Sequence, residues 1–120
     1  MVQLSEHFNK DEFVCNDGCG NDFDVPQELI DILEVARQEF NEPIHINSGF
    51  RCVIYNAQVG GAPNSFHLKA WAADIVINNK SAKEVYDYFD TQYPNKYGVI
   101  EYKNFVHVDV RPYKYHKPLD

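Results

Sequence analysis

The stretch from Ser65 to Asp74 places a histidine and a carboxylate directly before an apolar run. His67 and Asp74 stand seven residues apart, and Ile75-Val76-Ile77 follows them. Imidazole nitrogen and carboxylate oxygen are both good ligands for a divalent metal such as zinc. Two ligands do not complete a metal site, and a later segment supplies a third candidate, His107. Together these three residues predict a zinc hydrolase.

The segment around His107 has the alternation of a half-buried strand. Polar and apolar positions alternate from Phe105 to Arg111, so His107, Asp109 and Arg111 share one face while three valines face the core. A strand that buries valines and presents a histidine, a carboxylate and a guanidinium is a candidate wall of an active site. Taken alone, the pattern fits equally well a solvent-facing strand with an incidental ion pair.

Length and composition indicate one compact domain spanning residues 1–120. Hydrophobic residues make up 44% of the chain, enough for a core, and the net charge is −7. That charge argues against a nucleic-acid partner, which needs a basic surface. No apolar run approaches the roughly 18 residues of a membrane span. We therefore expect no membrane span. The first residues show no signal-peptide pattern, so we expect the protein to be made in the cytoplasm.

Hydrophobic periodicity predicts both helices and strands, which is typical of an α+β fold. Asp24 is the expected N-cap of a helix with Pro26 in its first turn, and Ser81 with Glu84 forms a capping-box pattern for another. Lys103-Asn104 is the expected hairpin turn. Helices are predicted over 9–13, 26–40, 53–59 and 82–93, and strands over 43–48, 97–102 and 105–111.

Three cysteines occur, at positions 15, 19 and 52. Their number does not fit a disulfide scaffold. The spacing of Cys15 and Cys19 allows a second metal site with Cys52 or a histidine. Half-buried cysteines, or one disulfide with a spare thiol, fit the same pattern better, because a closed zinc site needs four ligands at defined spacing.

These motifs together resemble the zinc D-alanyl-D-alanine carboxypeptidases and related peptidoglycan peptidases, a superfamily that also includes the Hedgehog signalling domain. The resemblance is closest to a short single-domain branch found in phages and bacteria. It is carried by these segments: Leu4-Ser5-Glu6-x-Phe8, Glu12-Phe13-x-Cys15, Ser48-Gly49-Phe50-Arg51-Cys52, Tyr55-Asn56, Gly60-Gly61-Ala62-Pro63-Asn64-Ser65, Ser65-x-His67, Ala70-x-Ala72-x-Asp74 and the strand with His107.

The resemblance implies an antiparallel sheet that carries a zinc ion and is backed by helices. Zn²⁺ would be bound by His67, Asp74 and His107, with water in the fourth position of an open catalytic site. Arg51 matches a family arginine that contacts the substrate, and its guanidinium fork suits a carboxylate. The implied substrate is the stem peptide of peptidoglycan, cut at a D-amino-acid bond by a monomeric carboxypeptidase or endolysin-type endopeptidase. The protein would then act on the cell wall after release.

Ser65 and Tyr55 are candidates for orienting the substrate or the metal ligands, and each could equally be a helix or turn residue. Two positions depart from the family pattern. The family usually has glycine at the position of Ala70, and many members carry an acidic residue at the position of Asn104.

The general base is therefore open. We predict that Asp109 is the base or its close partner, with Glu101 and His116 as alternatives. An even-numbered hairpin loop would pair Ile100 with His107 and turn Glu101 away from the metal.

Two other functions compete with a peptidase. A binding module that keeps zinc without an effective base would resemble the Hedgehog domain in this respect, and Asn104 keeps this alternative open. A structural domain without metal would require the three candidate ligands to be scattered in the fold.

Overall fold

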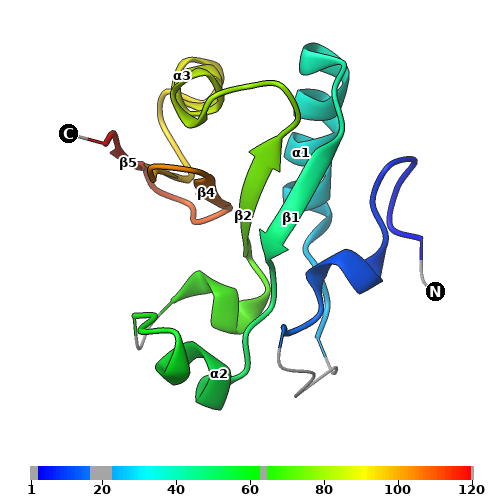
Figure 1. Cartoon of the computed structure of the whole chain (residues 1–120), viewed down its shortest axis with the longest axis vertical. Helices are drawn as coiled ribbons and strands as arrows, with labels where there is room; N and C mark the ends of the chain where they lie inside the picture. Colours follow the sequence, from blue (N-terminus) through cyan, green and yellow to red (C-terminus); the bar gives the residue numbers. More distant parts are fainter. Residues whose placement is uncertain (1–2, 17–22, 63–64, 120) are drawn as a thin grey trace.

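The computed structural model describes residues 3–16, 23–62 and 65–119. Helices are interspersed with the first two strands, and the last three strands follow one another after α3; two short 3-10 helices, η1 and η2, precede α1 and β2 (Figure 1). The elements are η1 (Lys10–Phe13), α1 (Gln27–Phe40), β1 (Ile44–Ser48), α2 (Val53–Gln58), η2 (Phe66–Lys69), β2 (Ala72–Ile77), α3 (Ala82–Gln92), β3 (Gly98–Glu101), β4 (Val106–Asp109) and β5 (Tyr115–Lys117).

The five strands form one sheet in the order β1-β2-β4-β3-β5. Every neighbouring pair is antiparallel except β3 and β5, which run parallel. The predicted α+β class, with an antiparallel sheet backed by helices, is confirmed. The hairpin between β3 and β4 has the register expected for an even-numbered loop, since Ile100 pairs with His107 and Glu101 pairs with Val106.

The two faces of the sheet have different roles. One face is apolar and packs in a single core with residues of α1 and α3, including Leu33, Phe89 and Val108. We call the opposite face the site face. Register places Ser48, Asp74, His107, Ile100 and Lys117 side by side across all five strands on this face. In Figure 1, α3 lies at one end of the long axis and α2 at the other.

Helix α1 starts where the sequence predicts, but its cap differs. Pro26 is the N-cap and makes no side-chain bond, so the prediction that Asp24 caps this helix is wrong. The Pro26 carbonyl accepts hydrogen bonds from the amides of Leu29 and Ile30 at 3.1 and 3.3 Å. Because proline already holds a φ close to the helical value, the chain turns into the helix there without a capping side chain.

The tail contributes a strand that the sequence analysis did not expect. β5 is only three residues long, too short to show a period, and it adds to the edge of β3. Its His116 faces α3, where Nδ1 lies 2.7 Å from Asp90 and Nε2 lies 3.0 Å from the Lys96 carbonyl. His116 therefore lies on the helix-covered side of the sheet, away from the three candidate ligands, which argues against it as the alternative base.

No helix within the described ranges has the length and apolar character needed to cross a membrane.

The capping box of α3 is present as predicted, and it generates a stability test. The Ser81 side chain accepts from the Glu84 amide, and the Glu84 carboxylate accepts from the Ser81 amide. We expect Ser81→Ala to lower the free energy of unfolding by about 1 kcal/mol, because it removes one half of this pair. Urea denaturation measures the change. Thr91→Ala, an exposed position in the last turn of α3, is the control and should change stability by less than half as much.

Candidate metal centre

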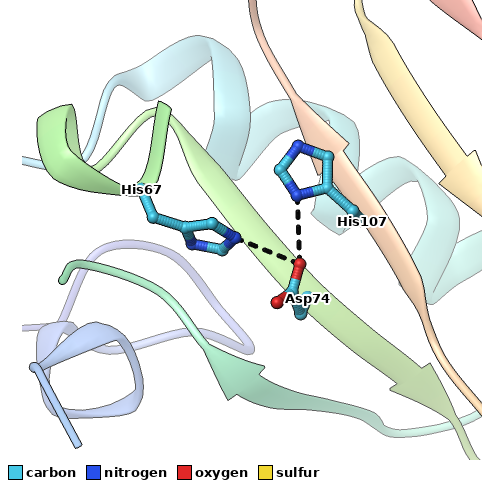
Figure 2. A group of neighbouring side chains, drawn as sticks. All are labelled: His67, Asp74 and His107. Carbon is cyan, nitrogen blue, oxygen red and sulfur yellow. Dashed lines mark hydrogen bonds and ion pairs between the residues drawn. The ribbon is translucent and has the colours of Figure 1, made fainter. Parts of the chain in front are cut away.

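Three elements bring the candidate ligands together. His67 lies in η2, Asp74 in β2 and His107 in β4, and register places Asp74 directly opposite His107. Figure 2 shows both imidazole rings turned toward one carboxylate oxygen of Asp74. His67 Nε2 lies 3.1 Å from Asp74 Oδ1, and His107 Nδ1 lies 3.0 Å from the same oxygen. One ligand atom from each residue falls within 4.8 Å of the others, and all three side chains are buried.

The far nitrogen of each ring is held by an acceptor. His67 Nδ1 lies 2.6 Å from the Gly49 carbonyl, and His107 Nε2 lies 2.7 Å from Asp109 Oδ2. A carbonyl and an ionised carboxylate can only accept, so each of these nitrogens carries the proton. The nitrogens that face Asp74 are then left with lone pairs. This arrangement, in which a carbonyl or carboxylate fixes the tautomer of a ligand histidine, is common around metal ions.

Three electron-pair donors thus converge on one point in a buried place. Two imidazole lone pairs and a carboxylate oxygen repel one another unless a cation, either a proton or a metal ion, lies between them. Two nitrogens and one oxygen are a donor set that zinc binds readily, and three protein ligands leave a coordination position open. The residues present therefore fit a catalytic type of zinc site.

When a proton rather than a metal ion lies between the donors, the rings can donate to Asp74, and the pKa values of the buried groups describe this protonated state. Burial raises the pKa of Asp74, but hydrogen bonds from His107 and His67 outweigh it and hold this pKa well below its usual range. Burial lowers the pKa of His107, yet its bonds to Asp109 and Asp74 prevail and raise it. The carboxylates are thus kept ionised, as metal ligation and its support require.

Asp109 occupies a closed cage of donors. Its Oδ1 accepts from the amides of Gly98 and Arg111, both at 3.1 Å, and from Arg111 Nε at 2.8 Å. Its Oδ2 accepts from His107 and, at 2.6 Å, from Arg111 Nη2. Burial raises the pKa of Asp109, but the bonds from Arg111 and His107 outweigh it and keep this pKa far below normal. Asp109 is fully buried. Of the two roles left open, its contacts favour the partner of His107 over a base that meets substrate.

Gly98 makes this cage possible. It pairs with Asp109 across the sheet, and a Cβ at this position would lie 2.2 Å from Asp109 Oδ2. Any side chain here would displace the carboxylate. The sequence analysis missed Gly98, because its role depends on a strand register that no local pattern contains.

Arg51 stands between the metal site and helix α2. Its guanidinium donates to Asp74 Oδ2 at 3.1 Å, to Ser48 Oγ at 3.1 Å and to Asn56 Oδ1 at 3.3 Å. Arg51 thus supports the candidate metal ligand Asp74, a contact that the sequence did not predict. A Cβ at Gly61 would meet Asn56 Oδ1 at 2.1 Å, so this glycine is needed for the close approach of the loop.

The structure also places the other candidate residues that the sequence suggested. Ser65 caps η2 by accepting from the amide of His67, so it has the turn role that was one of its two readings. Tyr55 lies on α2. Glu101 accepts from the Leu119 amide at 3.1 Å, away from the ligands as predicted. Asn104 is exposed in the hairpin loop.

Ala70, where the family usually has glycine, has a backbone conformation that favours glycine. Ala70 ends η2 with a φ of 60°, in the left-handed region that favours glycine. Alanine is tolerated there as a single residue, at a cost of about 1 kcal/mol. The second metal site considered for the cysteines involves Cys19, which lies outside the described residues. Of the other two cysteines, Cys15 Sγ is 3.9 Å from Cys52 Sγ.

A cavity of about 610 Å³ opens over the three candidate ligands. One side is formed by Arg51 and the loop from Val59 to Ala62, and the other carries aromatic rings, among them Tyr102, Phe105 and Tyr115. Arg111 lies in this wall, with its guanidinium carbon 4.6 Å from the ring centre of Phe66. Among the residues that the structure describes, Asp74 is the only carboxylate lining this cavity.

Comparisons with known proteins agree with this chemistry. A family model described as Peptidase M15 matches residues 6–109, a range that contains all three candidate ligands. The zinc D-Ala-D-Ala carboxypeptidase of Streptomyces albus G is 51% identical over 35 residues. This aligned segment is 29% of the present chain and 14% of the carboxypeptidase, so the likeness covers a small part of that relative.

The convergence of donors leads to a test of metal binding. We expect the wild-type chain to bind about one zinc ion, and His67→Ala and His107→Ala each to lose most of it, because two remaining ligands do not hold zinc firmly. His45→Ala, on the exposed side of β1, is the matched control and should bind as the wild type does. Elemental analysis after dialysis gives the zinc content. Full zinc in both site variants would exclude this centre.

The cage around Asp109 leads to a second test. Arg111→Lys keeps the charge but loses the two-pronged contact, so Asp109 should hold His107 less firmly. We expect zinc affinity to fall by about tenfold or more, as is usual when a partner of a ligand histidine is disturbed. Competition with a chromophoric chelator measures the affinity. Arg37→Lys on α1 is the control, and equal affinities in the two variants would contradict the coupling.

Proposed function

This chain belongs to the M15 peptidase family, and on that basis we propose that residues 1–120 form one zinc-dependent peptidase domain that hydrolyses a D-amino-acid peptide bond in peptidoglycan. The observation that carries the proposal is the convergence of His67, Asp74 and His107, with their outer partners in place, beneath an open cavity. The carboxypeptidase likeness adds the D-alanine chemistry.

The residues of the centre have distinct proposed roles. His67, Asp74 and His107 would hold Zn²⁺, while the Gly49 carbonyl and Asp109 fix the two rings. When bound, zinc would supply Lewis-acid chemistry by polarising a carbonyl and making a water molecule more acidic. Asp109 is a positioning residue in this proposal, because its oxygens are already engaged and it has no exposed surface.

Arg51 is proposed to bind the carboxylate of the substrate. Its side chain is 15% exposed and lines the cavity beside Asp74. Three of its five N–H groups point at Ser48, Asn56 and Asp74, which leaves donors for a ligand. These protein contacts hold the guanidinium in one orientation, and a fixed fork is suited to a planar carboxylate.

One observation favours a second candidate, a zinc-containing module that binds cell-wall peptide without cutting it. A peptidase of this kind needs a group that takes up a proton near the scissile bond. The carboxylates Asp109 and Glu101 do not line the cavity, and Asp74 is a proposed ligand. The two candidates make opposite predictions about turnover and the same prediction about zinc.

Hydrolysis with and without metal separates these candidates. Purified peptidoglycan is incubated with the zinc-loaded protein, with the protein in excess chelator, and with chelator followed by added zinc. We expect cleavage that chelation abolishes and zinc restores, and mass analysis of the released muropeptides identifies the bond. Zinc-dependent binding to peptidoglycan without any new fragment would favour the binding module instead.

Arg51→Lys tests the substrate role of this residue. The variant keeps the positive charge next to Asp74 but loses the fork, so we expect kcat/KM to fall by about tenfold to a hundredfold while zinc stays bound. Steady-state kinetics and zinc content are measured on the same preparation. Lys69→Arg, at an exposed cation over the ring of Phe66, is a comparison that should leave kcat/KM close to wild type. An unchanged rate in Arg51→Lys would remove it from the substrate site.

A further inference from the structure

The site face of the sheet continues beyond the metal centre. Ile100 of β3 lies next to His107, and Lys117 of β5 lies next to Ile100. Alternation puts Tyr115 and Lys117 on this face, and His116 on the other face confirms the direction by its contact with α3. The row of side chains that begins at the metal ligands therefore extends to the edge strand.

A second cavity lies over this extension. It has a volume of about 370 Å³, and it shares Ile100, Tyr102 and Tyr115 with the cavity above the metal ligands. Its outer part is formed by Glu101, Lys117, Pro118 and Leu119. The two cavities therefore border one another at these three residues, and we call the two together the groove.

The residues along the groove are exposed yet held in place. Tyr102 is 42% exposed, Tyr115 45% and Leu119 51%. The Tyr102 ring stacks on Phe105 with ring centres 4.5 Å apart, and the Tyr115 ring lies 4.9 Å from the guanidinium carbon of Arg111. Ordered aromatic rings that border a cavity are typical of surfaces that bind a ligand.

We propose that one extended peptide substrate fills both cavities. This inference rests on the proposed function and adds to it the length and direction of the substrate. With the substrate carboxylate at Arg51, the residues on the amino side of the cut bond run over Tyr102 and Tyr115 toward Leu119. Glu101 and Lys117 give the outer cavity one charge of each sign, which suits a peptide that carries both amino and carboxyl side groups.

Sheet geometry sets the length of peptide required. From β4 across β3 to β5 are two strand spacings, about 10 Å, and an extended peptide advances roughly 3.3 Å per residue. About three residues before the cut bond therefore reach the outer cavity. A two-residue substrate would fill only the cavity above the ligands.

Two peptide analogues test this reach on the zinc-loaded full chain. The short probe is acetyl-D-alanyl-D-alanine, and the long probe is a five-residue stem peptide with the same last pair. In both, the last peptide bond is replaced by a methylene-amine so that neither is cut. We expect both probes to shift the NMR amide signals near the metal ligands, and the long probe alone to shift those of Glu101, Lys117 and Leu119.

A substitution in the outer cavity completes the test. Leu119→Ser should weaken the long probe by about threefold to tenfold, the effect of losing one apolar contact, and leave the short probe unchanged. Val35→Ser is the matched control, because Val35 is 46% exposed on α1, away from the groove. Calorimetry measures both affinities.

The inference is overturned if the long probe leaves the outer amides unshifted, if Leu119→Ser affects both probes equally, or if neither probe binds. Chelator-sensitive hydrolysis of peptidoglycan is measured separately. Cleavage with an unoccupied outer cavity would reject the groove and retain the peptidase, whereas occupation of the groove without cleavage would reject the peptidase alone.

Discussion

The structure depends on keeping three lone pairs directed at one buried point. Two imidazole nitrogens face Asp74 Oδ1 at 3.0 and 3.1 Å, an arrangement that is unfavourable without a cation. What enforces it is the pair of acceptors behind the rings, the Gly49 carbonyl and Asp109. These acceptors belong to the sheet and to the turn that follows β1. The stability of the whole domain therefore keeps the two imidazole rings in their orientations.

The division of the sheet into two faces explains how a small domain maintains such a polar site. Helices α1 and α3 bury the apolar face, and this core supplies the stability that the buried charges do not. Each of the two buried carboxylates at the site is then matched by a guanidinium. Arg51 contacts Asp74 at 3.1 Å, and Arg111 contacts Asp109 at 2.6 Å. The carboxylates therefore remain ionised inside the protein.

Sequence patterns predicted the features that depend on local order. The alternation around His107 placed His107 opposite Ile100, and turned Glu101 away, on the condition of an even-numbered loop; the sequence left that condition open and the structure meets it. The cage of Asp109 was beyond prediction in detail, because Gly98 reaches it from another strand. β5 was also missed, since three residues carry no period and the strand forms by pairing with β3. The roles of the candidate site residues remain predictions.

Charge at the centre connects its architecture to the substrate we propose. The two arginines offset the two carboxylates of the site, so a divalent ion bound by the ligands would leave a surplus of positive charge there, in a chain whose net charge is −7. A negatively charged surface with one positive cavity concentrates its field at that cavity. An anionic end of a peptide would be drawn to Arg51, while its remaining residues meet the uncharged tyrosines of the groove. The arginine that pairs with Asp74 would therefore also orient the peptide in the cavity, with the peptide carboxylate at Arg51.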